Sequence, residues 1–332
     1  MATTETSGVT ARMGDVQAGT PSTQVSLTRV GVRGVEKVIR IDGGRLYFAE
    51  LECFVDLNPQ QAGVHMSRFE EIVNEAIDNV VLGETLRAEE LAAHIAEQIR
   101  SRQNGLRAEV SIAARYPETV PTPASGLETQ EIYTLLGTAV ASERGTRTLT
   151  GVEAQGMTAC PCAQGLLAGR ARERLLADGF SEDEIERVFD AVPVATHNQR
   201  GIGSLHIGRC ENTELEIDAR DLLHIVEDSM SSEIYELMKR SDEAAVVEKA
   251  HLNPRFVEDV VREMVRRVIE AYPALNDDCF ILARQENLET IHRHSVVAER
   301  SGLFGEVNAE LETGEHNRHH TTTREWLEAP SA

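Results

Sequence analysis

Two cysteines separated by a single proline are the strongest candidates for chemistry in this sequence. Cys160 and Cys162 flank Pro161, whereas the other three cysteines stand alone. Five cysteines form an odd set without the spacing of a disulfide framework, so we expect reduced thiols. Thiolates are soft ligands for zinc or iron, and one of a close pair can bind metal while the other faces a substrate. Structural zinc sites also contain such pairs, so this pair alone does not establish the chemistry.

Histidines form the second candidate group. His292 and His294 lie in a run that resembles a strand, which would place both imidazoles on one face of a sheet. Such a pair is typical of metal ligands or acid–base groups, with two exposed surface histidines as an equal alternative. Glu289 lies just upstream and could act in the same site. His197 follows a polar turn, where a lone histidine is more often a hydrogen-bonded loop residue.

Several well-known motifs are missing from the sequence. It contains no GxxxxGK[ST] loop, which argues against a P-loop nucleotidase. The fragment Gly201-Ile202-Gly203 lacks the third glycine of a dinucleotide-binding fingerprint. The signature of zinc nucleobase deaminases and the G-x-S-x-G elbow of serine hydrolases are also missing.

The charge balance argues against two classes of partner. The 332 residues carry 55 acids against 33 bases, a net charge of −22, which repels nucleic acids and anionic membranes. Arginine supplies nearly all the bases, and such an acidic, lysine-poor surface is typical of proteins in multimolar salt. We therefore expect a halophilic source rather than an ordinary acidic protein. No apolar run is long enough to span a bilayer and the N-terminus is polar, so a cytoplasmic location is expected.

The elements that must position these residues recur in a fixed order. In the first half, residues 35–41 and 45–55 read as a hairpin, two helices follow from Ser67 and over 88–102, and strands follow at 106–114 and around 132–133. In the second half, strands at 146–154 and 204–217 precede a helix over 219–238. A further helix is expected to open at Asn253-Pro254, and strands at 279–285 and 290–298 follow.

This order predicts an α+β fold made of two tandem ββααββ modules. The modules are expected at residues 29–143 and 144–305, with a helical insertion at 165–192 that contains a capping box at Ser181–Glu184. Residues 1–28 and 306–332 are expected to form flexible tails. Open antiparallel sheets have edges that several subunits can close into a barrel, so an oligomer is expected.

Together the motifs resemble one family, the type IB GTP cyclohydrolases and their archaeal MptA relatives. The resemblance runs in order over about residues 30–305 and rests on these strings: Asp56-Leu57-Asn58-Pro59, Gly63-Val64-His65-Met66-Ser67-Arg68-Phe69, Cys160-Pro161-Cys162, His197-Asn198-Gln199-Arg200, Glu233-Ile234-Tyr235-Glu236-Leu237-Met238-Lys239-Arg240, Glu248-Lys249-Ala250, Asn253-Pro254-Arg255-Phe256-Val257-Glu258-Asp259 and Glu289-Thr290-Ile291-His292-Arg293-His294. It implies the tunnelling fold (T-fold), with two modules per chain in an oligomeric barrel, usually a homotetramer.

The resemblance also implies roles for individual residues. The metal ligands would be Cys160, His197 and Glu233, with His292 nearby as a ligand or acid–base group, and which of the two cysteines binds metal stays open. Cys162 would be needed for catalysis, together with His292, His294 and Glu289. Glu248 would anchor the guanine ring. The basic residues expected to meet the triphosphate are Arg68, Arg200, Lys239, Arg240 and Lys249.

The implied reaction is attack of water on C8 of GTP followed by loss of formate, a step that a divalent metal assists. The archaeal branch is implied to use Fe(II), with Mn(II) or Zn(II) as alternatives, and to yield 7,8-dihydroneopterin 2′,3′-cyclic phosphate, formate and diphosphate. The bacterial branch yields 7,8-dihydroneopterin triphosphate. Either product would feed pterin or folate biosynthesis, and possible use in tRNA modification follows from the same resemblance. A purine- or pterin-binding module without catalysis is the rival hypothesis.

Overall fold

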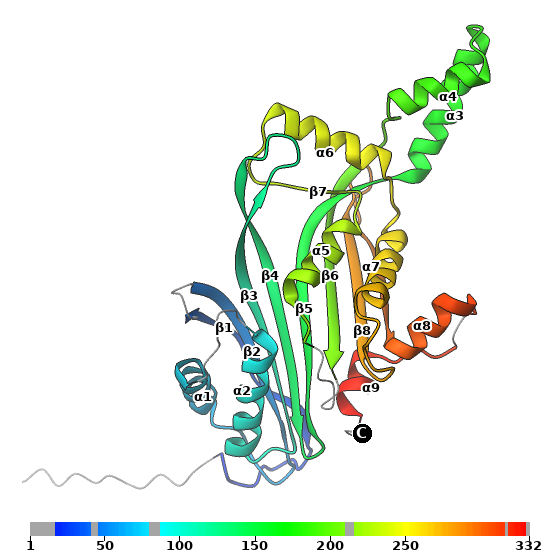
Figure 1. Ribbon diagram of the computed structural model, residues 1–332. Helices are drawn as coiled ribbons and strands as arrows, with labels where there is room; N and C mark the ends of the chain where they lie inside the picture. The colour runs from blue at the N-terminus through cyan, green and yellow to red at the C-terminus, as the bar shows by residue number, and fades with distance from the viewer. Residues whose placement is uncertain (1–16, 41–45, 80–86, 210–215, 316–317, 330–332) are drawn as a thin grey trace, which may run out of the picture.

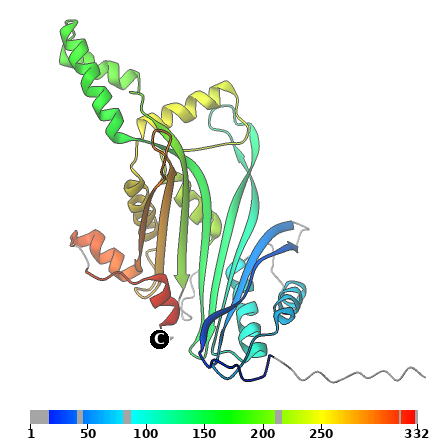
Figure 2. The same cartoon turned by 180° about the vertical axis from the view of Figure 1, so that it is seen from behind.

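The computed structural model describes residues 17–40, 46–79, 87–209, 216–315 and 318–329. Within them nine strands form one antiparallel sheet. Figure 1 shows helices packed on one face of this sheet, and Figure 2 shows the molecule from behind. None of the helices in these ranges is both long and apolar enough to cross a membrane.

The elements of the chain lie before and after the turn at residues 143–144. The first half contains β1 (Leu27–Arg40), β2 (Leu46–Leu57), α1 (Met66–Asn79), α2 (Ala88–Gln103), β3 (Arg107–Pro121) and β4 (Glu128–Ser142). The second half contains β5 (Gly145–Ala159), α3 (Pro161–Ala177), α4 (Glu182–Ala191), β6 (Asn198–Arg209), α5 (Ala219–Asp228), β7 (Ser232–Glu233), α6 (Arg240–Leu252), α7 (Val257–Ala271), β8 (Phe280–Leu288), β9 (Val296–Leu303), α8 (Phe304–Thr313) and α9 (Thr323–Glu328). The strands lie in the sheet in the order β1-β2-β3-β4-β5-β6-β8-β9, and β7 pairs with β5. Strands β4 and β5, on either side of the turn at residues 143–144, pair and so join both halves into one sheet.

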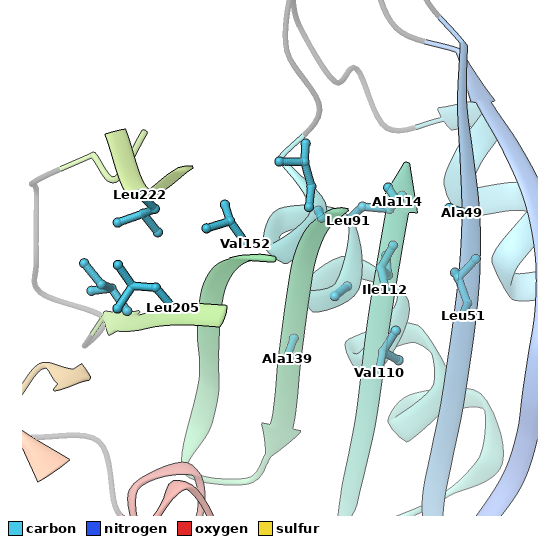
Figure 3. Packing of buried hydrophobic residues seen from close by; sticks show 14 of the residues in the cluster. Ala49, Leu51, Leu91, Val110, Ile112, Ala114, Ala139, Val152, Leu205 and Leu222 are labelled. Atoms are coloured by element: carbon cyan, nitrogen blue, oxygen red, sulfur yellow. The ribbon is translucent and has the colours of Figure 1, made fainter. Parts of the chain in front are cut away.

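The core lies between the sheet and its helices. Residues along β2 and β3 alternate between buried and less buried positions, as expected for strands with one covered face. Leu91 of α2 and Leu222 of α5 are fully buried against this face, together with strand residues such as Ile112 (Figure 3). Burying each side chain of this size stabilises the fold by roughly 1.5–3 kcal/mol. Phe48 of β2 stays 63% exposed, so part of the sheet is uncovered in the single chain.

The insertion forms an arm that projects beyond the end of the sheet (Figure 1). It consists of α3 and α4, and α3 has no buried residue. The expected capping box is confirmed, because Ser181 accepts a hydrogen bond from the Glu184 amide while the Glu184 carboxylate accepts one from the Ser181 amide.

Several expected elements differ in the structure. The helix expected over 219–238 ends at Asp228, where the Ser229 hydroxyl donates to the Ile225 carbonyl, and the chain continues into β7. Helix α6 was not expected, because its apolar residues follow no clear helical period. Asn253 does not open a helix but is the C-cap of α6, and α7 begins at Val257. The side-chain amide of Asn253 donates to the carbonyls of Met230 and Ser231.

The two expected tails have different outcomes. Residues 1–16 lie outside the described residues. The prediction of a tail over 306–332 is wrong for most of its length, because α8 continues to Thr313 and α9 covers Thr323–Glu328. Trp326 of α9 is buried and stacks on Phe280 with ring centroids 5.5 Å apart, and its indole N–H donates to the Asp278 carbonyl. Trp326 is therefore the buried anchor of a segment whose composition is largely polar.

A buried carboxylate connects the two halves above the sheet. Asp242 of α6 accepts hydrogen bonds from the backbone amides of Ala124, Ser125 and Lys239, and from the Ser125 hydroxyl. Ala124 and Ser125 belong to the turn between β3 and β4, so this carboxylate fixes α6 of the second half onto a hairpin of the first. Burial alone would raise the pKa of Asp242, but the four hydrogen bonds together hold it below the ordinary range.

We predict that Asp242→Asn lowers the melting temperature by several degrees at pH 7, because the asparagine NH₂ would face groups that also donate. The folded-state pKa of Asp242 is lowered, so its stabilising effect is complete above the ordinary aspartate pKa of about 4 and declines as the pH falls below it. Thermal unfolding followed by circular dichroism at pH 7 and at acidic pH measures both effects. Asp259→Asn, which affects an exposed carboxylate that accepts from the Phe256 amide and from Arg262, is the control and should cost less. Equal melting temperatures for wild type and Asp242→Asn at pH 7 would refute this role.

Candidate active site

The two cysteines lie where β5 ends and α3 begins. Cys160 is the N-cap of α3, and its sulfur accepts from the Ala163 amide at 3.5 Å. Pro161 occupies the first helical position, where its missing N–H costs no hydrogen bond. Cys162 is exposed in the first turn of the helix. The positive end of a helix favours a negatively charged sulfur, as a metal ligand or a nucleophile requires.

His197 lies directly beside Cys160 because β5 and β6 are paired. The last pair in their register is Ala159 with Asn198, and the Cys160 amide donates to the His197 carbonyl at 3.1 Å. The Thr196 hydroxyl donates to the Cys160 carbonyl at 2.8 Å. Two residues that are 37 positions apart in sequence, on either side of the arm, are thus held together by backbone hydrogen bonds.

The imidazole of His197 contacts two side chains through its Nδ1 atom. Gln199 Oε1 lies 3.0 Å from Nδ1, and Glu289 Oε2 lies 3.8 Å from it. The Glu289 side chain is only 7% exposed, and its Oε2 atom has no hydrogen-bond partner in the structure. The Thr290 hydroxyl donates to the Asn198 carbonyl and holds this segment against β6. Glu289 therefore lies beside His197 in the candidate site.

Glu233 approaches the same region from β7, which pairs with β5 at Gly156. Its two carboxylate oxygens accept from the Lys249 ammonium at 2.6 and 2.7 Å. Among the residues that the structure describes, no three Cys, His, Asp or Glu side chains lie close enough together to hold a metal ion. A sulfur and an imidazole on adjacent strand ends, beside a buried carboxylate oxygen without a partner, nevertheless match the ligand preferences of a divalent transition metal. Glu233 would have to exchange its ion pair with Lys249 to join them.

The expectation that His292 and His294 lie in a strand is wrong. Both are exposed in the connection between β8 and β9, and β9 begins only at Val296. Alternation along a strand therefore does not align them. Their rings stack instead, with centroids 5.2 Å apart and planes at 15°. The two imidazoles are adjacent, as expected, but for a different geometric reason.

The residues expected to bind the substrate divide into two groups. Lys239, Arg240, Glu248 and Lys249 lie at the start and on the body of α6, and Glu248 is exposed. Arg200 is exposed on β6. Arg68, in contrast, lies on α1, at the other end of the sheet from α3 and α6 (Figure 1), where its guanidinium donates to the Arg102 carbonyl. A single chain does not bring Arg68 to the other candidates.

A cavity of about 600 Å³, lined by polar and apolar residues, adjoins these residues. Its walls include Arg115, Glu131 and Tyr133 from the first half, and Gln199 and Arg200 from β6. Asn198, Thr290 and Ile234 also line it, and they are the immediate neighbours of His197, Glu289 and Glu233. The cavity therefore opens beside the candidate ligands and lies between the two halves.

Sequence reasoning missed the acidic groups inside this cavity. The Tyr133 hydroxyl donates to Glu227 Oε1 at 2.8 Å. Burial raises the pKa of Glu227 to about 7, and this hydrogen bond only partly opposes the increase. Glu131 accepts from the Thr129 hydroxyl and from the Glu236 amide. No local motif distinguishes these glutamates from the other acids of so acidic a chain.

Comparisons with known proteins give a consistent result. The family described as Type I GTP cyclohydrolase folE2 matches residues 13–298. The chain is 42% identical over 307 residues to GTP cyclohydrolase MptA of Methanococcus aeolicus, covering 90% of this chain and 99% of that one. It is 40% identical over 303 residues to GTP cyclohydrolase MptA of Haloferax volcanii, covering 90% and 98%.

Among solved structures, uricase from Arthrobacter globiformis superposes with a TM-score of 0.51 at 10% identity, covering 90% of this chain and 98% of that chain. At this low identity the likeness concerns the fold alone, and it agrees with the antiparallel α+β architecture described above. The family match spans most of the sequence, and the relatives align over nearly their whole length. The chain belongs to the type I GTP cyclohydrolase family.

Proposed function

We propose that this protein is a metal-dependent GTP cyclohydrolase, which opens the imidazole ring of GTP and releases C8 as formate. The observation that carries this proposal is the pairing of β5 with β6, which puts Cys160 and His197 side by side, next to Asn198 and Gln199 in the wall of a cavity. Membership of the family and relatives of about 40% identity named GTP cyclohydrolase MptA support the same activity. A purine- or pterin-binding protein without catalysis is the alternative.

The proposed metal ligands are Cys160, His197 and Glu233, with His292 close by. A bound Fe(II), or Mn(II) or Zn(II) in its place, supplies Lewis-acid activation of water for attack on C8. Lys249 forms an ion pair with Glu233 in the structure, and it would pair with a substrate phosphate instead if Glu233 bound metal.

The proposed catalytic residues lie around this metal site. Cys162, exposed on the first turn of α3, lies one residue beyond the N1 proline and acts on the substrate side. His292 or His294 exchanges protons as the ring opens, and Glu289 orients the site.

The substrate would lie along α6. Glu248 accepts hydrogen bonds from the guanine edge, a contact that adenine cannot match. Arg240 lies about 12 Å from Glu248 along the helix axis, at 1.5 Å per residue, and Lys239 precedes it. Lys239, Arg240 and Arg200 bind the phosphate oxygens. A nucleoside triphosphate carries its base and its terminal phosphate at opposite ends, as this placement requires.

We further propose that the chain adopts the tunnelling fold and assembles into a barrel-shaped homo-oligomer, most simply a tetramer. Two observations support this. Part of the sheet face is uncovered, with Phe48 and Ile132 exposed. Arg68 is remote from the other substrate candidates within one chain, so it can take part only if a second copy supplies it.

The proposed product is 7,8-dihydroneopterin 2′,3′-cyclic phosphate, with formate and diphosphate. The relatives named MptA and the arm that separates Cys162 from His197 support this product over 7,8-dihydroneopterin triphosphate. The reaction would supply pterin or folate biosynthesis, and a contribution to tRNA modification is part of the same proposal. The acidic, lysine-poor composition supports a halophilic source.

The decisive experiment is anaerobic incubation of the purified protein with GTP and Fe(II) in high salt, with formate and the pterin product identified by mass. We expect formate and a cyclic-phosphate pterin, and we expect Cys162→Ala to release no formate while its circular dichroism spectrum stays unchanged. A triphosphate product would move the protein to the other branch of the family. If Fe(II), Mn(II) and Zn(II) all failed to support formate release, the binding-protein alternative would replace the proposal.

Glu248→Gln tests the proposed guanine contact. The amide presents an NH₂ group toward guanine donors, so we expect the Kd for GTP to rise at least tenfold, about 1.4 kcal/mol. Isothermal titration with GTP measures this change, and Glu243→Gln, an exposed glutamate on the same helix, is the matched control. An unchanged Kd would remove Glu248 from the guanine site.

A further inference from the structure

We propose that Gln199, held by Thr158, is a positioning residue that fixes His197 with its proton on Nδ1 and leaves Nε2 free to bind metal. The inference rests on the metal site of the proposed function and assigns the tautomer of its histidine. Gln199 and Thr158 are partners in the β5–β6 register, one pair before the terminal pair of Ala159 with Asn198, next to which Cys160 and His197 lie. Both are buried, with exposed fractions of 5% and 0%.

The hydrogen bonds form a short relay. Gln199 Nε2 donates to the Thr158 hydroxyl oxygen at 3.0 Å, which directs Gln199 Oε1 toward His197. Oε1 lies 3.0 Å from His197 Nδ1. A carbonyl oxygen only accepts, so Nδ1 must carry the proton in this contact. A neutral imidazole has a single N–H, and Nε2 then keeps its lone pair.

Glu289 determines which way the amide of Gln199 is turned. In the reversed orientation the NH₂ group would face His197, and Nδ1 would have to be an unprotonated acceptor. The Glu289 carboxylate lies 3.8 Å from the same nitrogen and its nearer oxygen has no hydrogen-bond partner. A buried anion beside Nδ1 favours an N–H there over a lone pair. Glu289 thus favours the orientation in which Oε1 faces His197, and the Thr158 hydroxyl accepts from Nε2 in that orientation.

This arrangement matters because metal-binding histidines depend on the partner of their other ring nitrogen. Such partners fix the ring and its tautomer, and their loss typically costs 10- to 100-fold in metal affinity. In this chain the partner is built into the strand pairing, because the register that aligns Cys160 with His197 also sets Thr158 opposite Gln199.

The first measurement is the tautomer of His197 in metal-free protein labelled with ¹⁵N-histidine, read from two-bond ¹H–¹⁵N correlations. The His197 signal is assigned by its loss in His197→Asn. We expect the Nδ1–H form in the wild type and a mixture of tautomers in Gln199→Leu. Thr158→Val should weaken the preference, whereas Thr158→Ser, which keeps the hydroxyl, should restore it.

The second measurement is titration of the same metal-free variants with Co(II), followed by visible absorption. We expect Gln199→Leu to weaken binding about 10- to 100-fold. Gln285→Leu is the matched control, since Gln285 is fully buried on β8 and its amide contacts Asn287 and Met230 rather than His197. In Gln285→Leu, the His197 tautomer and the Co(II) affinity should match those of the wild type.

The outcomes separate this inference from the proposed function. A wild type that binds no Co(II) would contradict the metal site, and the tautomer spectra would still decide the role of Gln199. A wild type that binds Co(II), with Gln199→Leu unchanged in both tautomer and affinity, would overturn the inference and leave the proposed function intact. Should Gln199→Leu fail to fold, Thr158→Val and Thr158→Ser provide the same comparison with Gln199 in place.

Discussion

The antiparallel pairing of β5 with β6 is the interaction on which the candidate site depends. The arm of α3 and α4 is inserted between these two strands. Because the strands pair up to their ends, Cys160 before the arm and His197 after it lie within hydrogen-bonding distance. Register in a sheet is strongly specified, because a slip by one residue turns every side chain to the opposite face. The same pairing therefore fixes the ligand candidates, the Gln199–Thr158 contact and one wall of the cavity.

Buried polar groups hold the two halves of the chain together around the candidate site. Asp242 joins α6 to the β3–β4 turn, and the Tyr133–Glu227 contact joins β4 to α5. Both connect residues that lie about 100 positions apart, across the boundary between the halves. Buried polar groups destabilise a fold unless they are paired, so these contacts favour one relative placement of the halves and of the cavity between them.

The sequence allowed much of the architecture to be predicted because apolar periodicity reports which face of an element is covered. Helix α2 was predicted on that basis and lies at the expected residues, whereas β1 pairs with β2 as expected but begins at Leu27, eight residues earlier than predicted. Sequence patterns failed where tertiary contacts determine the structure. Helix α6 has only Val246 and Ala250 as buried apolar residues and is fixed by the hydrogen bonds of Asp242, and α9 is docked by Trp326 and by contacts from Arg147.

The candidate site was predictable only in part. Cys160, His197 and Glu289 were identified from motifs, and the structure brings them together. The ion pair between Glu233 and Lys249, the stacked His292 and His294, and the remote position of Arg68 depend on three-dimensional placement that no local spacing encodes. Glu227 was missed because its raised pKa arises from burial, which its neighbours in the chain do not reveal.

X-ray absorption spectroscopy on the zinc-loaded protein tests most directly the central claim that β5–β6 pairing builds a metal site. The account predicts one sulfur at about 2.3 Å together with imidazole nitrogen at about 2.0–2.1 Å, and the sulfur signal should disappear in Cys160→Ala or in Cys162→Ala, which identifies the ligand. A coordination shell without sulfur, or a spectrum unchanged by His197→Asn, would contradict it.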